Sequence, residues 1–173
     1  MPVRDATPDD LPMIRELLHR HAASEADIDL GEAGDDELAG ALFGPAPTAR
    51  ATLAETVGTP PLVIGLALWF PTFSSWSLRG GIWLEDLFVA EEHRRTGAGR
   101  ELMEDLRART GGRIEWDVSR GNIRAERFYR RLGARPVSGW TRYRWLPELD
   151  PEPQPHLEPR PGNTTAPEAA RRG

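Results

Sequence analysis

The sequence contains no cysteine and no lysine, and each absence excludes a class of chemistry. Without cysteine there is no disulfide, no thiolate metal site and no cysteine nucleophile. Without lysine there is no Schiff base to a carbonyl substrate or to pyridoxal phosphate, and no phosphate-binding loop of the type that requires lysine. All 22 basic residues are arginine.

Long apolar runs are also missing. The longest, Leu62 to Phe70, is too short to cross a bilayer, and the polar start MPVRDATPDD does not have the pattern of a signal peptide. We therefore predict a cytoplasmic protein with no membrane partner. The net charge of -5 disfavours nucleic acid as a partner and favours a cationic ligand. His19 and His21 are predicted on a helix surface, because no carboxylate stands at metal-ligand spacing beside them, and no metal site is expected.

A change in composition divides the chain. Residues 147–173 are rich in proline, glutamate and glycine and show no apolar period, which predicts a disordered tail. Residues 1–146 contain enough apolar side chains for one folded domain.

Periodicity and turn signals predict a mixed α/β domain with the order βααβββαβαβ. Thr7-Pro8-Asp9-Asp10 is typical of a helix start. The predicted helices are a first one after Thr7 and then 35–43, 97–110 and 122–132. The predicted strands are 2–5, 50–56, 62–70, 81–89, 113–118 and a last one or two within 137–145. Alternation in the second half implies a partly parallel central sheet flanked by helices.

Two segments carry candidate chemistry. In the first, Arg94-Arg95-Thr96-Gly97-Ala98-Gly99 joins a strand to a helix, and its glycines and the free N–H groups of the helix start are suited to a pyrophosphate. A dinucleotide fold is disfavoured, because Leu102 stands where its third glycine is needed. In the second, Glu85 and Asp86 interrupt an apolar strand. Since adjacent strand residues point to opposite faces, we expect one, Glu85, to be catalytic and Asp86 to line a pocket or serve structure.

Together with a later segment, this loop resembles the GNAT acetyltransferase superfamily. The motif (Arg or Gln)-x-x-Gly-x-(Gly or Ala) is matched by Arg94, Gly97 and Gly99. The signature Asn-x-x-Ala-x-x-Phe-Tyr followed by Gly-Ala is matched by Asn122, Ala125, Phe128, Tyr129, Gly133 and Ala134. A closer resemblance is to diamine acetyltransferases of the spermidine/spermine type. It is carried by Leu42 to Pro45, Phe73 to Trp76, Trp83 to Val89 and Trp140 to Tyr143.

The resemblance implies an N-acetyltransferase that uses acetyl-CoA and moves the acetyl group to a small cationic amine, such as a polyamine or diamine, by direct attack on the thioester. It implies cofactor contacts from the backbone of Leu87, Phe88 and Val89, from Arg94, Arg95, Thr96, Gly97, Ala98, Gly99 and Arg100, and from Asn122 and Ala125. Tyr129 would be the general acid at the departing sulfur and Glu85 would act in deprotonating the amine. Glu25, Trp76, Glu85 and Asp86 would line the amine pocket. A homodimer is implied as well.

The sequence departs from the family near Glu25, where Ser24 replaces a common aromatic residue. Three alternatives therefore stay open: a protein N-terminal acetyltransferase, an amino-acid acetyltransferase of thialysine type, and a non-catalytic acyl-CoA-binding module.

Overall fold

The computed structural model describes residues 1–25 and 34–145. The chain divides into two compact units, Met1–Arg135 and Pro136–Gly173. The predicted tail, residues 147–173, lies outside the described residues. All the elements described below belong to the first unit.

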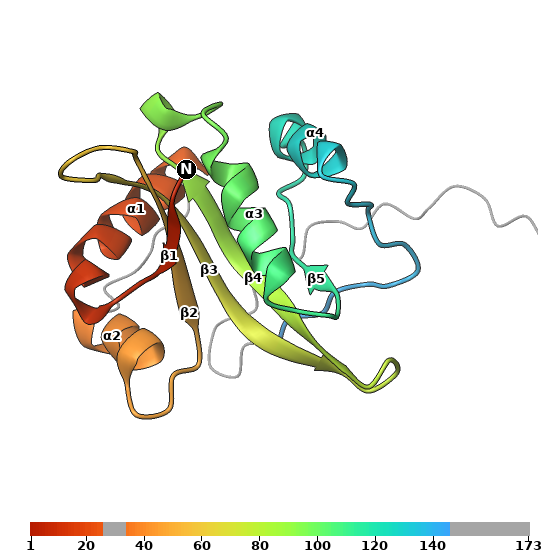
Figure 1. The fold of residues 1–173 in the computed structure, drawn as a ribbon. Helices are drawn as coiled ribbons and strands as arrows, with labels where there is room; N and C mark the ends of the chain where they lie inside the picture. Colours follow the sequence, from red (N-terminus) through yellow and green to blue (C-terminus); the bar gives the residue numbers. More distant parts are fainter. Residues whose placement is uncertain (26–33, 146–173) are drawn as a thin grey trace, which may run out of the picture. The chain divides into compact units, whose positions relative to one another are not determined.

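A five-stranded sheet with the order β1-β2-β3-β4-β5 forms the centre of this unit (Figure 1). Its strands are β1 Val3–Asp5, β2 Arg50–Glu55, β3 Val63–Ser74, β4 Arg79–Val89 and β5 Ile114–Glu115. Neighbouring strands from β1 to β4 are antiparallel, and β5 runs parallel to β4. The helices are α1 Leu11–Ser24, α2 Asp35–Phe43, α3 Ala98–Ala108 and α4 Ile123–Arg131. The predicted mixed sheet flanked by helices is confirmed.

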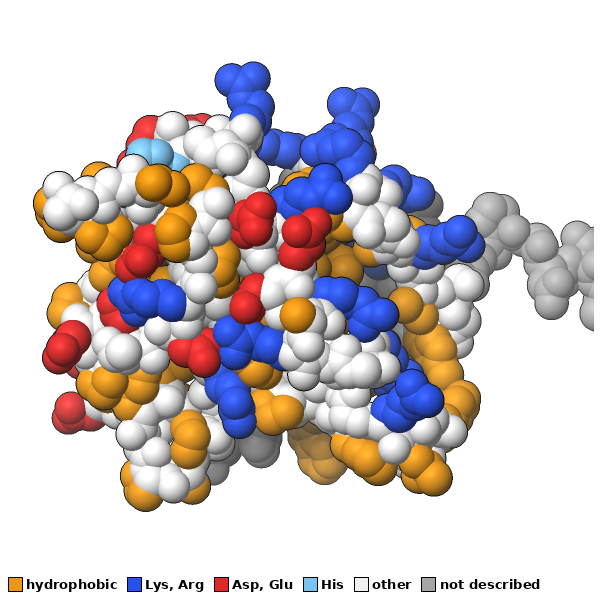
Figure 2. Space-filling model, viewed as in Figure 1, with side chains coloured by type: hydrophobic (Ala, Val, Ile, Leu, Met, Phe, Trp, Pro, Cys, Tyr) orange, Lys and Arg blue, Asp and Glu red, His pale blue; other side chains and the backbone are white. Residues whose placement is uncertain are grey.

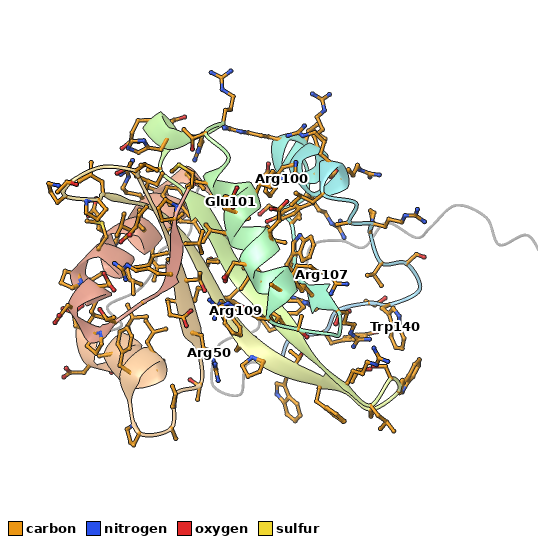
Figure 3. All side chains as sticks on the ribbon, in the orientation of Figure 1. Arg50, Arg100, Glu101, Arg107, Arg109 and Trp140 are labelled. Carbon is orange, nitrogen blue, oxygen red and sulfur yellow. The ribbon has the colours of Figure 1, made fainter. Side chains whose placement is uncertain are left out.

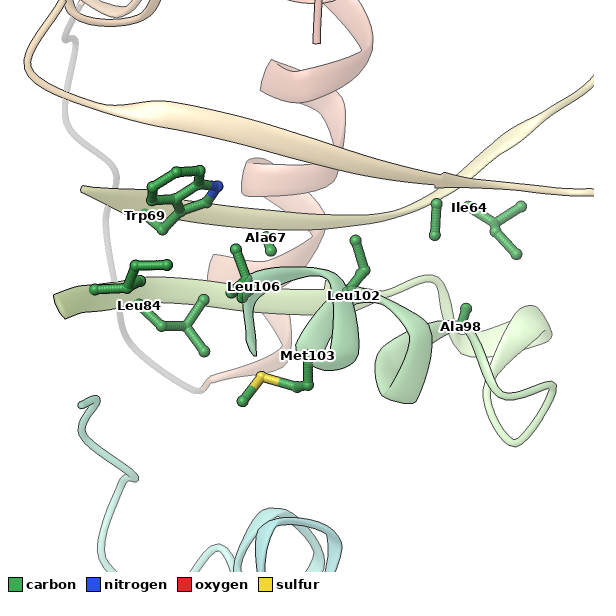
Figure 4. Close-up of a cluster of buried hydrophobic side chains, with 10 residues drawn as sticks. Ile64, Ala67, Trp69, Leu84, Ala98, Leu102, Met103 and Leu106 are labelled. Atoms are coloured by element: carbon green, nitrogen blue, oxygen red, sulfur yellow. The ribbon is translucent and has the colours of Figure 1, made fainter. Parts of the chain in front are cut away.

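Helices cover both faces of the sheet and create two apolar cores. On one face, α1 and α2 place Ile14, Leu17 and Leu42 against Leu53, Leu66 and Phe88. On the other face, α3 places Ala98, Leu102, Met103 and Leu106 against Ile64, Ala67, Trp69 and Leu84 (Figure 4). Burying an apolar side chain of this size contributes about 1.5–3 kcal/mol, so the two cores supply most of the favourable energy of folding.

The predicted helix start at Thr7 is confirmed, with a short 3₁₀ turn at Pro8–Asp10 that leads into α1. The Asp10 carboxylate accepts hydrogen bonds from the Thr7 N–H at 2.7 Å and from Thr7 Oγ1 at 2.9 Å. Arg4 on β1 donates to both oxygens of the same carboxylate at 2.7 and 2.8 Å. This arrangement joins the first strand to the first helix and holds the pKa of Asp10 well below its usual range, chiefly through the Arg4 hydrogen bonds.

Several predicted strands differ in the structure, and the one predicted at 62–70 is the longer strand Val63–Ser74. The segment 113–118 forms only the short β5, and the residues from Val137 to Trp145 contain no strand in the described part of the chain. Most large apolar side chains of that last segment are exposed, among them Val137, Trp140, Tyr143 and Trp145. The apolar character of this segment alone therefore does not produce a strand. None of the helices in the described residues is long and apolar enough to span a bilayer.

Candidate active site

The candidate site begins at an edge of β4 that the sheet leaves open. β5 pairs with β4 only at Ile82 and Trp83, although β4 continues to Val89. The Ala90 N–H donates to Ile64 on β3 at 2.9 Å. Because backbone groups alternate sides along a strand, those of Leu87 and Val89 point the other way, toward the open edge. The cofactor-contacting positions predicted at Leu87 and Val89 therefore present hydrogen-bonding backbone there, whereas the side chain of Phe88 is buried.

A β-bulge changes the direction of the side chains in the middle of β4. Leu68 pairs with Asp86 and Trp69 with Leu84, so Glu85 is an extra residue without a partner. Leu84 and Leu87 consequently both contact the α3 core. Glu85 and Asp86 lie between them and share the opposite face. The expectation that these two carboxylates point to opposite faces is wrong, because the bulge resets the alternation between them.

Each carboxylate has a partner on that face. Glu85 Oε2 accepts a hydrogen bond from Trp83 Nε1 at 2.7 Å, and its side chain is exposed. Asp86 Oδ1 lies 3.4 Å from His21 Nε2 of α1, and the His21 ring lies 5.4 Å from that of Phe88.

The helix-surface position predicted for His21 is wrong. Its side chain is 21% exposed, and Nδ1 is buried without a hydrogen-bond partner. The helical spacing does put His21 on the same face as Ile14 and Leu18, but the sequence does not indicate that α1 crosses β4 at Asp86. The structure thus adds an imidazole to the acidic pair.

The predicted pyrophosphate loop leads into α3. Gly97 caps the helix with φ +100°, and Arg95 also has a positive φ of 69°. The loop from Arg95 to Gly97 is exposed, whereas Ala98 is buried in the core and fixes the start of α3. The first N–H groups of a helix have no partner within it and carry partial positive charge, so this loop is suited to an anion.

The arginines around this loop differ in their hydrogen-bond partners and in their exposure. Arg94 Nε donates to the Val89 carbonyl at 3.1 Å, which braces the end of β4. Arg100 pairs with Glu104 on the same helix at 2.7 Å, and its position near α4 is visible in Figure 3. Arg95 is exposed, as are the α4 residues Arg124, Arg127, Arg130 and Arg131. Figure 2 shows arginine side chains gathered over the loop before α3 and over α4, so the predicted cofactor end of the site is basic within an acidic protein.

Tyr129 lies on the β5 side of the opening. Its ring centroid is 4.6 Å from that of Trp116, which follows β5, and 5.1 Å from that of Phe128. Both Tyr129 and Leu87 pack against the α3 core. Burial raises the pKa of Tyr129 to about 12, with a smaller contribution from the charge of Glu25. The phenol is therefore protonated at neutral pH.

Glu25 and Asn122 form a further part of the site and are joined by a hydrogen bond. Glu25 accepts from Ser119 Oγ at 2.8 Å and from Asn122 Nδ2 at 3.3 Å. Asn122 Oδ1 accepts from the Ala125 N–H at 3.0 Å and so caps α4. Gly99 lies under α4 as well, because a Cβ there would stand 3.4 Å from Phe128 Cζ.

Trp76 is the one predicted site residue that lies apart from the others. It is 82% exposed in the turn between β3 and β4. Glu85 is six residues beyond Arg79, the first residue of β4, which at strand spacing is about 20 Å. Within one chain the structure does not bring Trp76 to the acidic pair.

No group of three or more potential metal ligands occurs among residues 1–25 and 34–145. The arrangement combines an open strand edge, a helix start suited to an anion, two carboxylates on one face of β4, and a buried tyrosine that packs against the α3 core. Such a site fits a group-transfer enzyme that takes a donor with an extended arm and an anionic end.

Comparison with known proteins gives the family. The chain matches the acetyltransferase (GNAT) family over residues 15–134 and belongs to it. Enzymes of this family use acetyl-CoA, and the protein is an N-acetyltransferase.

Among curated proteins, the chain is 27% identical to an L-ornithine N5-acetyltransferase of Arabidopsis thaliana. The alignment covers 80% of this chain and 81% of that protein. It is also 27% identical to a thialysine N-epsilon-acetyltransferase of Bos taurus, over 83% of this chain and 91% of that protein. Among solved structures, a probable acetyltransferase aligns with a TM-score of 0.72 and 24% identity, covering 87% of this chain and all of the other. A possible acetyltransferase of Clostridium difficile aligns with a TM-score of 0.70 and 18% identity, over 84% and 96%. The structural matches support the fold.

Proposed function

We propose that the enzyme transfers the acetyl group of acetyl-CoA to a primary amine of a small cationic substrate, by direct attack of the amine on the thioester. The observation that carries this proposal is the bulge in β4. It sets Glu85 and Asp86 on the same face of the strand, directly before the open edge at Leu87 and Val89. Two carboxylates attract a cation, and the edge of β4 beyond its pairing with β5 offers a place for the thioester.

For the donor, we propose that the backbone of Leu87 and Val89 holds the pantetheine arm, and that a backbone N–H of this edge polarises the thioester carbonyl. The exposed loop from Arg95 to Gly97 and the first turn of α3 would bind the pyrophosphate. The side chain of Arg94 is engaged with the Val89 carbonyl. Its contribution would then be to keep the end of β4 in place.

For the acceptor, the difficulty is the proton. An alkyl amine with a pKa of about 10.4 is almost entirely protonated at pH 7, and removing that proton costs about 4.6 kcal/mol. The carboxylate of an acid with a pKa of about 4.3 is too weak a base to remove that proton directly. Glu85 is exposed, so we propose that it accepts the proton through water. Asp86, held beside His21, would contribute its charge to the attraction of the substrate.

For the leaving group, Tyr129 is the proposed donor. With a pKa of about 12, full transfer of its proton to a thiolate with a pKa of about 8.5 is uphill by about 5 kcal/mol. Tyr129 would therefore donate a hydrogen bond to the sulfur as charge develops, with proton transfer completed only as the thiolate departs.

The names of the curated relatives favour one substrate class. Ornithine and thialysine are amino acids that carry a second amine on the side chain. A doubly cationic substrate of this kind, or a diamine or polyamine, fits the two adjacent carboxylates better than a protein N-terminus with one charge. The homodimer implied by the resemblance stays a prediction.

A panel of amines tests the proposal by the release of CoA from acetyl-CoA. The panel contains ornithine, thialysine, 1,4-diaminobutane and spermidine, together with a neutral amine of matched length and a peptide with a free N-terminus. We expect turnover with at least one dication and little with the neutral amine. Turnover of the peptide alone would favour an N-terminal acetyltransferase. Binding of acetyl-CoA without transfer to any amine would favour the non-catalytic module.

A further inference from the structure

Glu25 connects two helices that are distant in the sequence. It is the residue that ends α1, and its carboxylate reaches the loop before α4. Ser119 Oγ donates to Oε2 at 2.8 Å, and Asn122 Nδ2 donates to Oε1 at 3.3 Å. Each carboxylate oxygen thus has a donor from the loop before α4, although the family resemblance implies that Glu25 lines the amine pocket.

The connection continues into the backbone of α4. Asn122 uses its amide nitrogen for Glu25 and its amide oxygen for the Ala125 N–H. A hydrogen bond of this kind satisfies one of the free N–H groups of a helix start and sets the direction of its first turn. A carboxylate that holds Asn122 in place therefore also holds the start of α4.

Tyr129 lies two turns along this helix from its cap. Its ring is held laterally between Trp116 and Phe128, but these contacts do not fix the helix along its axis. The position of the phenol along the axis depends on where α4 begins, and this is decided at Asn122.

We propose that Glu25 is a positioning residue for Tyr129, acting through the Asn122 cap, and that it does not serve as an amine-binding carboxylate. The inference rests on the proposed role of Tyr129 at the departing sulfur. In this role the carboxylate of Glu25 serves the start of α4 rather than the substrate. The negative charge of Glu25 also raises the pKa of Tyr129, so the titration of the phenol reports on the nearby carboxylate.

Steady-state kinetics of Glu25→Gln separate the two roles. The amide keeps the shape but loses the charge and can no longer accept two hydrogen bonds. We expect kcat to fall about tenfold, as for other small misplacements of a reacting group, while KM for the amine stays within about twofold. Ser119→Ala, which removes one donor and no charge, should also lower kcat.

The control is Glu16→Gln, an exposed substitution on the same helix as Glu25. A rise in KM for the amine at unchanged kcat would overturn the inference in favour of an amine-binding role.

A second measurement does not depend on activity. The chain has two tyrosines, Tyr129 and Tyr143, so Tyr143→Phe leaves one phenol whose ionisation can be followed by ultraviolet absorbance. In that background Glu25→Gln should lower the pKa of Tyr129, and an unchanged pKa together with unchanged hydrogen exchange in α4 would overturn the inference. If Tyr129→Phe retains full kcat, the proposed role of Tyr129 fails, while the titration still decides whether Glu25 affects the ionisation of the phenol.

If Tyr129 assists the leaving sulfur and Glu25 positions Tyr129, the two substitutions act on one step. Glu25→Gln should then lower kcat no further in the Tyr129→Phe background.

Discussion

Trp83 Nε1 donates a 2.7 Å hydrogen bond to Glu85 Oε2, although the two residues flank Leu84 in a strand. The bond orients the carboxylate that we assign to amine deprotonation. Glu85→Gln keeps the shape and removes the proton acceptor. We expect low activity at neutral pH and partial recovery as pH approaches about 10, where free amine becomes abundant. The measurement is the pH profile of kcat/KM for the amine.

The control for this variant is Glu37→Gln, an exposed substitution in the first turn of α2. If Glu85→Gln only raises KM at every pH and leaves kcat intact, Glu85 attracts the substrate and does not accept its proton. An unchanged profile would remove Glu85 from the site altogether.

Tyr129→Phe removes one hydroxyl and keeps the ring that packs on Trp116. General acid assistance contributes about 10²- to 10⁴-fold, so kcat should fall within that range while the affinity for acetyl-CoA is preserved. Tyr143→Phe is the matched control, because Tyr143 is 90% exposed. Steady-state kinetics and calorimetry with acetyl-CoA give the two quantities. Equal kcat in both variants would contradict the assignment.

Gly97 is the residue whose backbone conformation controls the anion loop. A Cβ at this position meets no atom within 4 Å, but the φ of +100° is one that other residues rarely adopt. Gly97→Val should therefore weaken acetyl-CoA binding, both by straining the loop and by obstructing the approach of the pyrophosphate. Gly111→Ala, also with open space and without a positive φ, should bind normally. Unchanged affinity in a folded Gly97→Val variant would show that the cofactor does not use this loop.

Asp10 gives a prediction about stability and pH. Its pKa is lowered mainly by the Arg4 hydrogen bonds, so its contribution to stability is complete above the unfolded-state pKa of about 3.9 and is lost as pH falls below it. Asp10→Asn should lower the free energy of unfolding at pH 7 by about 1–2 kcal/mol. The difference from the wild type should shrink below about pH 4.

Denaturant unfolding at several pH values measures this difference, with the exposed Asp9→Asn as control. A difference that stays constant down to pH 2 would mean that the Arg4 contact does not depend on the charge of Asp10.

The helices predicted at 35–43, 97–110 and 122–132 agree with the structure to within two residues, whereas the strand predicted at 62–70 extends to Ser74. The second helix was expected at 35–43 and lies at Asp35–Phe43. The sequence also predicted the capping arrangement of Thr7 and Asp10 and the turn at Gly97. Each of these depends on interactions within a few residues: an N-cap, an apolar period, or a residue free to take positive φ. The family motifs around Gly97 and Tyr129 belong to the same kind of signal, and they led to the correct family and fold class.

Relationships between distant segments were decided only by the tertiary structure. The shared face of Glu85 and Asp86 depends on how β4 pairs with β3, and a bulge is a property of the pair rather than of one strand. The contact of His21 with Asp86 requires α1 to cross β4, and the contact of Glu25 with Asn122 requires the end of α1 to meet α4. The last predicted strand failed for the same reason, since an apolar segment becomes a strand only where an edge and a core receive it. The sequence by itself determined the helices, most of the strands, the family and the candidate residues, because these follow from short-range chemistry. The tertiary structure determined which of those residues face one another, because packing sums contacts along the whole chain.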